Sequence, residues 1–249
     1  MLNRASILIP HDTNSICAEH TANVEWAAAR WRVSLPEVEV IVGGVGRANR
    51  SANRNALARA ASGDMLLWFD GDAVVADPRA VLDYVCEALQ AGNPLVRLGG
   101  GVRWLGRPTT RKLLAEPPPT GPMPEDTWPP HVRIAPSPAQ GGTRTSRHGG
   151  LMYATTRRNW ERIQWDERFV DWGREDTAWT YAIERLIGRG HWAPQFAWHL
   201  WHPRTRAHKW RSSSAQANHE RWLQYQGAST EELQALVAGA NRSERNLWY

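Results

Sequence analysis

The 249-residue sequence is poor in cysteine, and it has no long apolar run. Its two cysteines, Cys17 and Cys86, exclude the disulfide framework of a small secreted domain. The apolar stretch before Pro10 is too short for the core of a signal peptide. No stretch approaches the roughly 18 apolar residues of a membrane span. We therefore expect a cytoplasmic protein without membrane association.

Lysine is also scarce, and arginine supplies nearly all of the positive charge. Lys112 and Lys209 are the only lysines among 30 basic residues, and the formal net charge is +5. The planar guanidinium group suits phosphates, so the bias favours a phosphate-bearing ligand, either a nucleotide or a nucleic acid. A GC-rich genome that codes arginine in place of lysine would give the same bias.

Phenylalanine is replaced by tryptophan to an unusual degree. The chain has 15 Trp against 5 Tyr and 3 Phe, and 10 of the 15 lie at or beyond Trp160. Such rings can fill a core or stack on sugar rings. We expect Trp160, Trp179 and Trp192 to be core residues and Trp172 to face a sugar.

Strands and helices alternate through the first hundred residues. This alternation is typical of βαβ units, and it predicts an α/β fold with a mainly parallel sheet flanked by helices. The expected strands are 6–10, 38–42 and 65–69, and the expected helices are 18–31, 47–62 and 78–92.

A proline-rich stretch interrupts this pattern at about residues 115–148, where we expect a long irregular loop, either a lid or a disordered segment. Residues 212–249 are expected to form two helices, the second opened by a capping box from Ser229 to Glu232. The predicted organisation is one domain over 1–211 and a helical tail over 212–249. Between the proline-rich stretch and the tail we expect strands at 151–154 and 193–201 and helices at 156–163 and 176–187.

The first candidate site is Asp70-Gly71-Asp72, which directly follows the apolar run 65–69. In an open α/β sheet, ligands bind beyond the carboxyl ends of the strands. Two carboxylates at that point can hold a divalent cation that bridges substrate phosphates, and Gly71 lets the backbone approach a ligand closely. A simple turn after a strand would contain the same tripeptide.

Basic residues near this site are candidates for binding a pyrophosphate. Arg47, Arg50 and Arg54 share one face of the expected helix 47–62, although a solvated basic face would have the same spacing. Asp12, shortly after Pro10, can accept from a nucleobase or ribose, or it can cap the next helix.

The second candidate site is the pair Glu175-Asp176, which follows Trp172-Gly173 and opens an expected helix. A helix dipole favours carboxylates at its N-terminus, and one of them can act as a general base toward a hydroxyl. The adjacent ring of Trp172 offers an apolar face for a sugar.

Two histidines complete the set of candidates. His199 and His202 precede Pro203, and in a turn there they could converge on a cation. Imidazole suits Mn²⁺ alongside carboxylates. Taken alone, such histidines are more often surface or core residues.

Taken in order, these segments resemble a nucleotide-sugar glycosyltransferase of the GT-A fold over roughly residues 5–205. The N-terminal part resembles the large family 2 group, and the C-terminal part is similar to the catalytic segment shared by β-1,4-galactosyltransferases and polypeptide N-acetylgalactosaminyltransferases. The first resemblance rests on Pro10, Arg54-Asn55, Gly63 and Asp70-Gly71-Asp72. The second rests on Gly149-Gly150, Trp165-Asp166-Glu167-Arg168-Phe169 and Trp172-Gly173-Arg174-Glu175-Asp176.

The resemblance implies transfer of a sugar, with inversion, from a nucleotide-diphosphate donor to a hydroxyl of a glycan, protein or small molecule. A UDP-sugar is the favoured donor. Retention of the anomeric configuration stays open as an alternative to inversion, because one of the related families retains it. The implied cofactor is Mn²⁺ or Mg²⁺, held by Asp72, His202 and His199. Asp176 matches the catalytic base, with Glu175 as its neighbour. The candidate donor contacts are Pro10, Asp12, Arg47, Arg50, Arg54, Asp70, Gly71, Trp172 and Gly173.

The sequence departs from these families at two places. Gly43-Gly44 stands where family 2 has an acid, which puts nucleobase recognition in question, and Arg174 replaces a familiar glycine. The lack of a membrane anchor or signal in the sequence suggests a bacterial or phage enzyme.

Two alternatives stay open: an enzyme of this fold that acts on modified bases in DNA, and a non-catalytic carbohydrate-binding protein. The first alternative is motivated by the basic cluster Arg204, Arg206, His208, Lys209 and Arg211. Nucleic acid is therefore a possible partner, but it is less favoured than a glycan, protein or small molecule.

Overall fold

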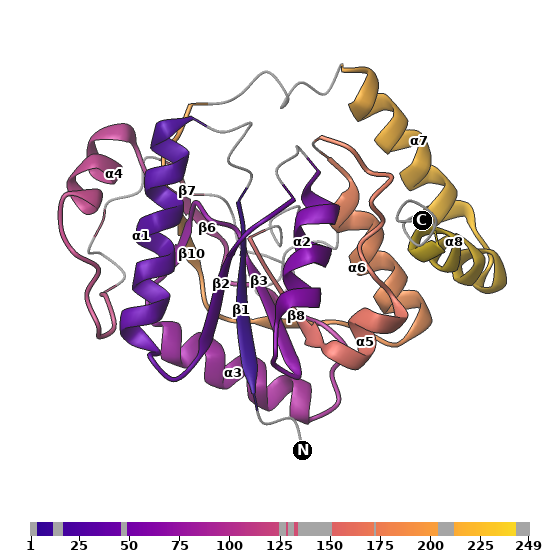
Figure 1. Ribbon diagram of the computed structural model, residues 1–249, viewed down its shortest axis with the longest axis horizontal. Coiled ribbons are helices and arrows are strands. Elements are labelled where there is room, and N and C mark those ends of the chain that lie inside the picture. The colour runs from indigo at the N-terminus through magenta and orange to yellow at the C-terminus, as the bar shows by residue number, and fades with distance from the viewer. Residues whose placement is uncertain are drawn as a thin grey trace.

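The computed structural model describes residues 4–11, 17–45, 49–124, 128, 132–133, 151–171, 173–203 and 212–242. Two sheets organise this part of the chain, with helices packed around them (Figure 1). The larger sheet has the order β2-β1-β3-β8-β5-β9, and the smaller has the order β4-β10-β6-β7.

The larger sheet is mainly parallel, as the sequence predicts. β1 pairs parallel with β2 and β3, and β5 pairs parallel with β9, while β8 runs antiparallel to both of its neighbours. Its strands are β1 (Ala5–Pro10), β2 (Glu39–Gly43), β3 (Met65–Phe69), β5 (Val96–Leu98), β8 (Met152–Thr156) and β9 (His191–Ala193). Those of the smaller sheet are β4 (Ala73–Val75), β6 (Val102–Trp104), β7 (Val132–Arg133) and β10 (Ala197–His199).

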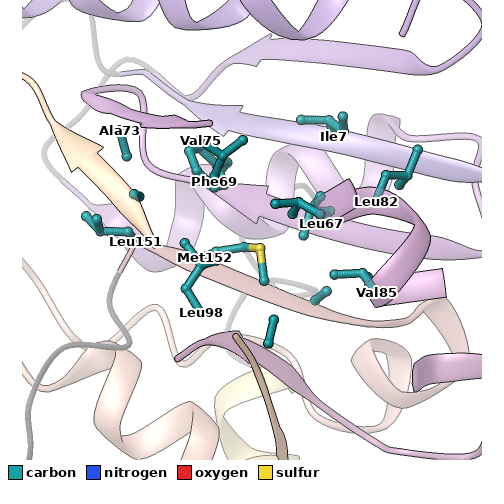
Figure 2. Close-up of a cluster of buried hydrophobic side chains, with 14 of the residues drawn as sticks. Ile7, Leu67, Phe69, Ala73, Val75, Leu82, Val85, Leu98, Leu151 and Met152 are labelled. Atoms are coloured by element: carbon teal, nitrogen blue, oxygen red, sulfur yellow. The ribbon is translucent and has the colours of Figure 1, made fainter. Parts of the chain in front are cut away.

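Helices cover both faces of the larger sheet, so the alternating side chains of its central strands enter two different cores. Ile7 and Leu67 join the cluster that contains residues of α1 and α3, and the intervening Leu8 joins the cluster that contains residues of α2 and α6. Figure 2 shows Leu67 of β3 with Leu82 and Val85 of α3 in the first cluster. The helices are α1 (Ala18–Ser34), α2 (Arg50–Ala60), α3 (Pro78–Gln90), α4 (Arg107–Leu114), α5 (Arg157–Arg162), α6 (Glu175–Leu186), α7 (Ser213–Gly227) and α8 (Thr230–Arg242).

The strand expected over 193–201 is wrong as a single element. β9 ends at Ala193 in the larger sheet, and β10 begins at Ala197 in the smaller one. Pro194 lies between them, and a proline has no N–H to donate to a strand ladder. The break lets the chain leave one sheet for the other, which brings His199 toward the carboxyl end of β3.

The start of the proline-rich stretch packs against α1. The buried guanidinium of Arg30 donates to the carbonyls of Ala76, Pro119 and Gly121. The indole of Trp26 donates to the carbonyl of Glu116 at 2.8 Å. Residues 116–124 are thus irregular, as expected, but they are fixed in place; most of 125–148 lies outside the described residues.

The two expected tail helices are present as α7 and α8, beside α6 (Figure 1). Tyr225 and Leu233 are buried in the same cluster as Trp179 of α6. The predicted capping box is confirmed, because the backbone N–H of Ser229 donates to the Glu232 carboxylate at 2.7 Å and the N–H of Glu232 donates to Ser229 Oγ at 3.2 Å. None of the described helices is both long enough and apolar enough to cross a bilayer.

Candidate active site

The Asp70-Gly71-Asp72 segment forms a tight turn between β3 and β4. The N–H of Ala73 donates to the carbonyl of Asp70 at 3.0 Å, and the N–H of Leu200 donates to the carbonyl of Asp72 at 2.7 Å. Gly71 is buried, and a Cβ there would lie 2.5 Å from Val24 Cγ2. The glycine therefore lets α1 pack closely on the turn, while its predicted contact with a nucleotide stays a prediction.

Three imidazoles surround the buried carboxylate of Asp72. Its Oδ2 lies 3.0 Å from His202 Nε2, 3.4 Å from His199 Nε2 and 3.6 Å from His20 Nε2. Its Oδ1 is buried and has no hydrogen-bond partner among the residues that the structure describes. His20 lies in the first turn of α1 and was not predicted as a site residue.

Backbone carbonyls fix how two of these rings are oriented. Nδ1 of His199 lies 2.9 Å from the carbonyl oxygen of Leu200, and Nδ1 of His202 lies 3.0 Å from that of Pro203. Because a carbonyl only accepts, each Nδ1 carries the hydrogen, and in a neutral ring Nε2 presents its lone pair to Asp72. Lone pairs facing a carboxylate require either a proton or a cation between them.

The electrostatics keep Asp72 anionic. Burial by itself would raise the pKa of the Asp72 carboxyl, but the neighbouring His199 and the hydrogen bonds of His20 and His202 hold that pKa well below its usual range. Burial lowers the pKa of His199, and the contact with Asp72 raises the pKa of His202 against the effect of burial.

A cation would fit this arrangement. One ligand atom from each of His20, Asp72 and His202 lies within 4.8 Å of the others. Two ligands placed about 2.1 Å from one ion at 90–110° lie about 3.0–3.5 Å apart, close to the 3.0–3.6 Å separations between the imidazoles and Asp72. His199, predicted as a ligand, lies outside this group of three and stacks on Trp104 at 3.7 Å between ring centroids.

The second acid pair begins α6, as predicted. Glu175 is buried; its Oε1 lies 3.4 Å from Nη1 of Arg50, and its Oε2 accepts from the N–H of Gly173 at 3.2 Å. Asp176 is half-buried and accepts from the hydroxyl of Tyr153 at 3.0 Å and from the N–H of Thr177 at 2.7 Å.

The backbone before α6 is strained. Asp171 and Arg174 have φ angles of 61° and 73°, in the left-handed region that side chains disfavour, and Gly173 has a φ of 110°. Such residues cost of order 1 kcal/mol or more and persist only where the surroundings hold them. Arg174 thus adopts, at a cost, a conformation that a glycine would adopt freely.

Arg54 joins the two acid pairs. Its buried guanidinium lies 3.3 Å from Oδ1 of Asp70 and 3.5 Å from Oε1 of Glu175, above the ring of Trp165 at 4.4 Å from the ring centroid. Burial raises the pKa of Asp70 to about 6 although Arg50 and Arg54 favour its charged form. Arg54 is 1% exposed, so it positions both carboxylates, whereas the half-exposed Arg50 can meet a ligand.

The structure does not place every predicted residue. Pro10 ends β1 and is half-buried. Asp12, Arg47 and Trp172 lie outside the described residues, as do Gly149-Gly150 and the basic cluster at 204–211. The missed His20 could have been found from its position at the start of the helix after β1, because that helix begins at the sheet edge where β3 ends.

Comparison with known proteins identifies the fold. No protein-family model matches the sequence, and no curated protein matches it. The structure of GalNAc-T7 with UDP, GalNAc and Mn²⁺ is similar, with a TM-score of 0.50 and 14% identity over 96% of this chain and 55% of that one. The chain therefore has the predicted GT-A fold.

Two further solved structures are similar at lower scores. Glucosyl-3-phosphoglycerate synthase from Mycobacterium tuberculosis with Mn²⁺, UDP and glucosyl-3-phosphoglycerate has a TM-score of 0.49 and 13% identity over 90% of this chain and 78% of that one. A mutant Drosophila β-1,4-galactosyltransferase 7 with manganese, UDP-Gal and xylobiose has a TM-score of 0.41 and 12% identity over 70% and 58%. The chain spans little more than half the length of GalNAc-T7 and of the Drosophila enzyme.

Proposed function

We propose that the chain is a metal-dependent glycosyltransferase that moves a sugar from a nucleotide-diphosphate donor, favoured to be a UDP-sugar, to an acceptor hydroxyl. The observation that carries this proposal is the linkage of two acid pairs through one buried arginine. Asp70 and Glu175 are 105 positions apart in the sequence, yet both contact Arg54. The presence of UDP, GalNAc and Mn²⁺ in the similar GalNAc-T7 structure supports it.

The donor set around Asp72 suits a divalent cation. A buried carboxylate with one unpaired oxygen and two imidazoles, His20 and His202, would hold Mn²⁺ or Mg²⁺. When bound, the ion supplies positive charge for the donor pyrophosphate and for the departing nucleoside diphosphate. The half-exposed Arg50, which lies 3.4 Å from Glu175, adds a guanidinium suited to the same pyrophosphate.

Asp176 is the proposed general base. Tyr153 and the backbone of Thr177 donate to it, which fixes the carboxylate in one orientation, while Glu175 is engaged by Arg50, Arg54 and Gly173. Asp176 takes the proton of the acceptor hydroxyl as its oxygen bonds to the anomeric carbon. The bond from that carbon to the diphosphate oxygen breaks on the opposite face, so the anomeric configuration inverts.

The test is a set of nucleotide sugars incubated with Mn²⁺ and simple glycan acceptors. Asp176→Asn should bind UDP with Mn²⁺ as the wild type does but transfer sugar about 10²–10⁴-fold more slowly, the usual contribution of a general base. Asp171→Asn is the matched control, because it makes the same change in the segment just before α6 and asparagine tolerates the left-handed backbone. Unchanged turnover in Asp176→Asn would refute the assignment, and NMR of the product decides between inversion and retention.

The alternatives have less support. A lectin-like use of tryptophan needs exposed rings, and every tryptophan that the structure describes is buried or half-buried. The nucleic-acid reading rests on the basic cluster at 204–211, which lies outside the described residues, so it stays a prediction. The cytoplasmic location and the bacterial or phage source also stay predictions.

A further inference from the structure

His20 is placed against the Asp72 carboxylate by the packing of α1. Val24 stands one helical turn beyond His20, on the same face of α1, and it packs against Gly71. Because Gly71 has no side chain, α1 approaches the turn closely enough for His20 Nε2 to lie 3.6 Å from Asp72 Oδ2. The ring is also held by neighbouring imidazoles, stacked on His11 at 6.1 Å and edge-on to His202 at 5.0 Å between ring centroids.

We propose that His20 is a third protein ligand of the cation, so that the chain binds a transition-metal dication before any nucleotide arrives. This inference rests on the metal site of the proposed function but not on sugar transfer. The ligands come from three separate segments: the first turn of α1, the turn after β3 and the segment after β10.

Among the described residues, two polar atoms of the cluster lack a matching donor, and they support a cation at this position. Asp72 is 7% exposed, and its Oδ1 has no partner in the described part of the chain. In a neutral ring, the Nε2 atom of His202 directs a lone pair at the same carboxylate, because its Nδ1 is engaged by a carbonyl. A cation bound by the carboxylate and by Nε2 turns this repulsion into two attractive contacts.

The number and kind of ligands determine when the ion binds and which ion is preferred. Mg²⁺ is usually held by one or two carboxylates together with substrate phosphates, so it binds such sites weakly alone. Three preorganised side chains remove much of this dependence on the nucleotide. Two imidazoles also favour Mn²⁺ and the later first-row dications over Mg²⁺, which prefers oxygen.

The experiment titrates the protein with Mn²⁺ alone, without nucleotide, and follows the free-ion EPR signal. The wild type should bind one Mn²⁺, and a tenfold excess of Mg²⁺ should not displace it. His20→Ala should weaken Mn²⁺ binding about 100-fold or more, since even an outer partner of a ligand contributes about 10–100-fold. His219→Ala, which changes an exposed histidine of α7, should bind as the wild type does.

A second substitution separates loss of a ligand from loss of structure. His20→Glu supplies a carboxylate of similar reach and should restore Mn²⁺ binding to within about tenfold of the wild type while admitting Mg²⁺ more readily. His20→Asn should bind as weakly as His20→Ala. The metal-free melting temperatures of the three variants, measured in EDTA, show that each is folded.

The inference is overturned if His20→Ala binds Mn²⁺ as tightly as the wild type, if His20→Glu binds no better than His20→Ala, or if the wild type binds Mn²⁺ only with UDP present. Failure of the proposed function is distinguishable. A chain that binds Mn²⁺ through His20 but transfers no sugar would refute the function and leave this inference intact.

Discussion

Replacement of Arg54 by methionine should destabilise the protein strongly, because it leaves two carboxylates without their shared cation. Asp70 and Glu175 both contact this guanidinium, which is 1% exposed. Breaking a buried ion pair by removing one partner costs about 3–5 kcal/mol. The nitrogen–oxygen distances of 3.3 Å and 3.5 Å exceed those of the strongest charge-assisted hydrogen bonds, so we expect the lower end, about 3 kcal/mol.

Thermal unfolding followed by circular dichroism measures this effect. For a chain of this size, a loss of 1 kcal/mol lowers the melting temperature by about 2–4 °C, so Arg54→Met should melt roughly 6–12 °C below the wild type. The measurements are made in EDTA, so that bound metal does not contribute to stability.

Arg50→Met is the matched control, because Arg50 reaches the same oxygen of Glu175 at 3.4 Å from a side chain that is 41% exposed. Solvent screening reduces such a contact to about 0–1 kcal/mol, so its melting temperature should fall by less than about 4 °C. In Arg54→Met, the further change Glu175→Gln removes a buried charge that has lost one of its two guanidinium partners and should restore part of the stability. Equal melting temperatures for Arg54→Met and Arg50→Met would refute this account.

Two further predictions concern the packing that holds the site. Gly71→Ala should lose about 1–3 kcal/mol, since its Cβ would overlap Val24, and Val24→Ala should restore most of that loss. Gly121→Ala, where no atom lies within 4 Å of the added Cβ, should melt as the wild type does. Asn55→Leu should lose about 3 kcal/mol, because it removes the hydrogen bonds that Asn55 makes with Trp160, Trp165 and Glu167, as urea unfolding would show. Asn93→Leu, which removes a bond to one carbonyl, should cost less than half as much.

The elements that the sequence predicts well are those whose signals are local. β3 was expected over 65–69 and occupies those five residues, because a buried strand is a continuous apolar run between polar residues. α3 starts where Asp77 caps the N–H of Ala80 and Pro78 takes the first turn. β4, β5 and β6 were missed, since three residues each are too few to show a period, and their place depends on partners elsewhere in the chain.

The residues of the candidate site likewise fall into those with a local sequence signal and those placed by tertiary packing. The pairs 70–72 and 175–176 are contiguous in sequence and follow or begin regular elements, so they could be identified directly. For His20 the sequence offers only its position at the start of the helix after β1, because its approach to Asp72 depends on Val24 packing on Gly71, which is a tertiary contact. The burial of Arg54 could not be predicted for a related reason: helical spacing places it beside Arg50, but only the packing of Trp165 shows that it is buried.

Part of the tryptophan excess is explained by rings that are buried under the site and do not line its surface. Trp68, Trp165 and Trp179 are buried together, with the last two rings stacked at 4.0 Å between centroids. Arg54 lies above the Trp165 ring, so these apolar rings shield its ion pairs with Asp70 and Glu175 from water on that side.

Phenylalanine could also supply an apolar ring at these positions, but it could not donate a hydrogen bond. The indole of Trp68 donates to the carbonyl of Arg54 at 2.9 Å, that of Trp160 to Oδ1 of Asn55 at 3.1 Å, and that of Trp179 to the carbonyl of Ile163 at 2.8 Å. Two of these bonds end on α2, one at Arg54, which contacts Asp70 and Glu175, and one at Asn55, which contacts Glu167. Each of these three rings therefore contributes apolar area and a directed donor at once, and the bond from Trp68 holds the backbone of Arg54, to which both carboxylates are bound.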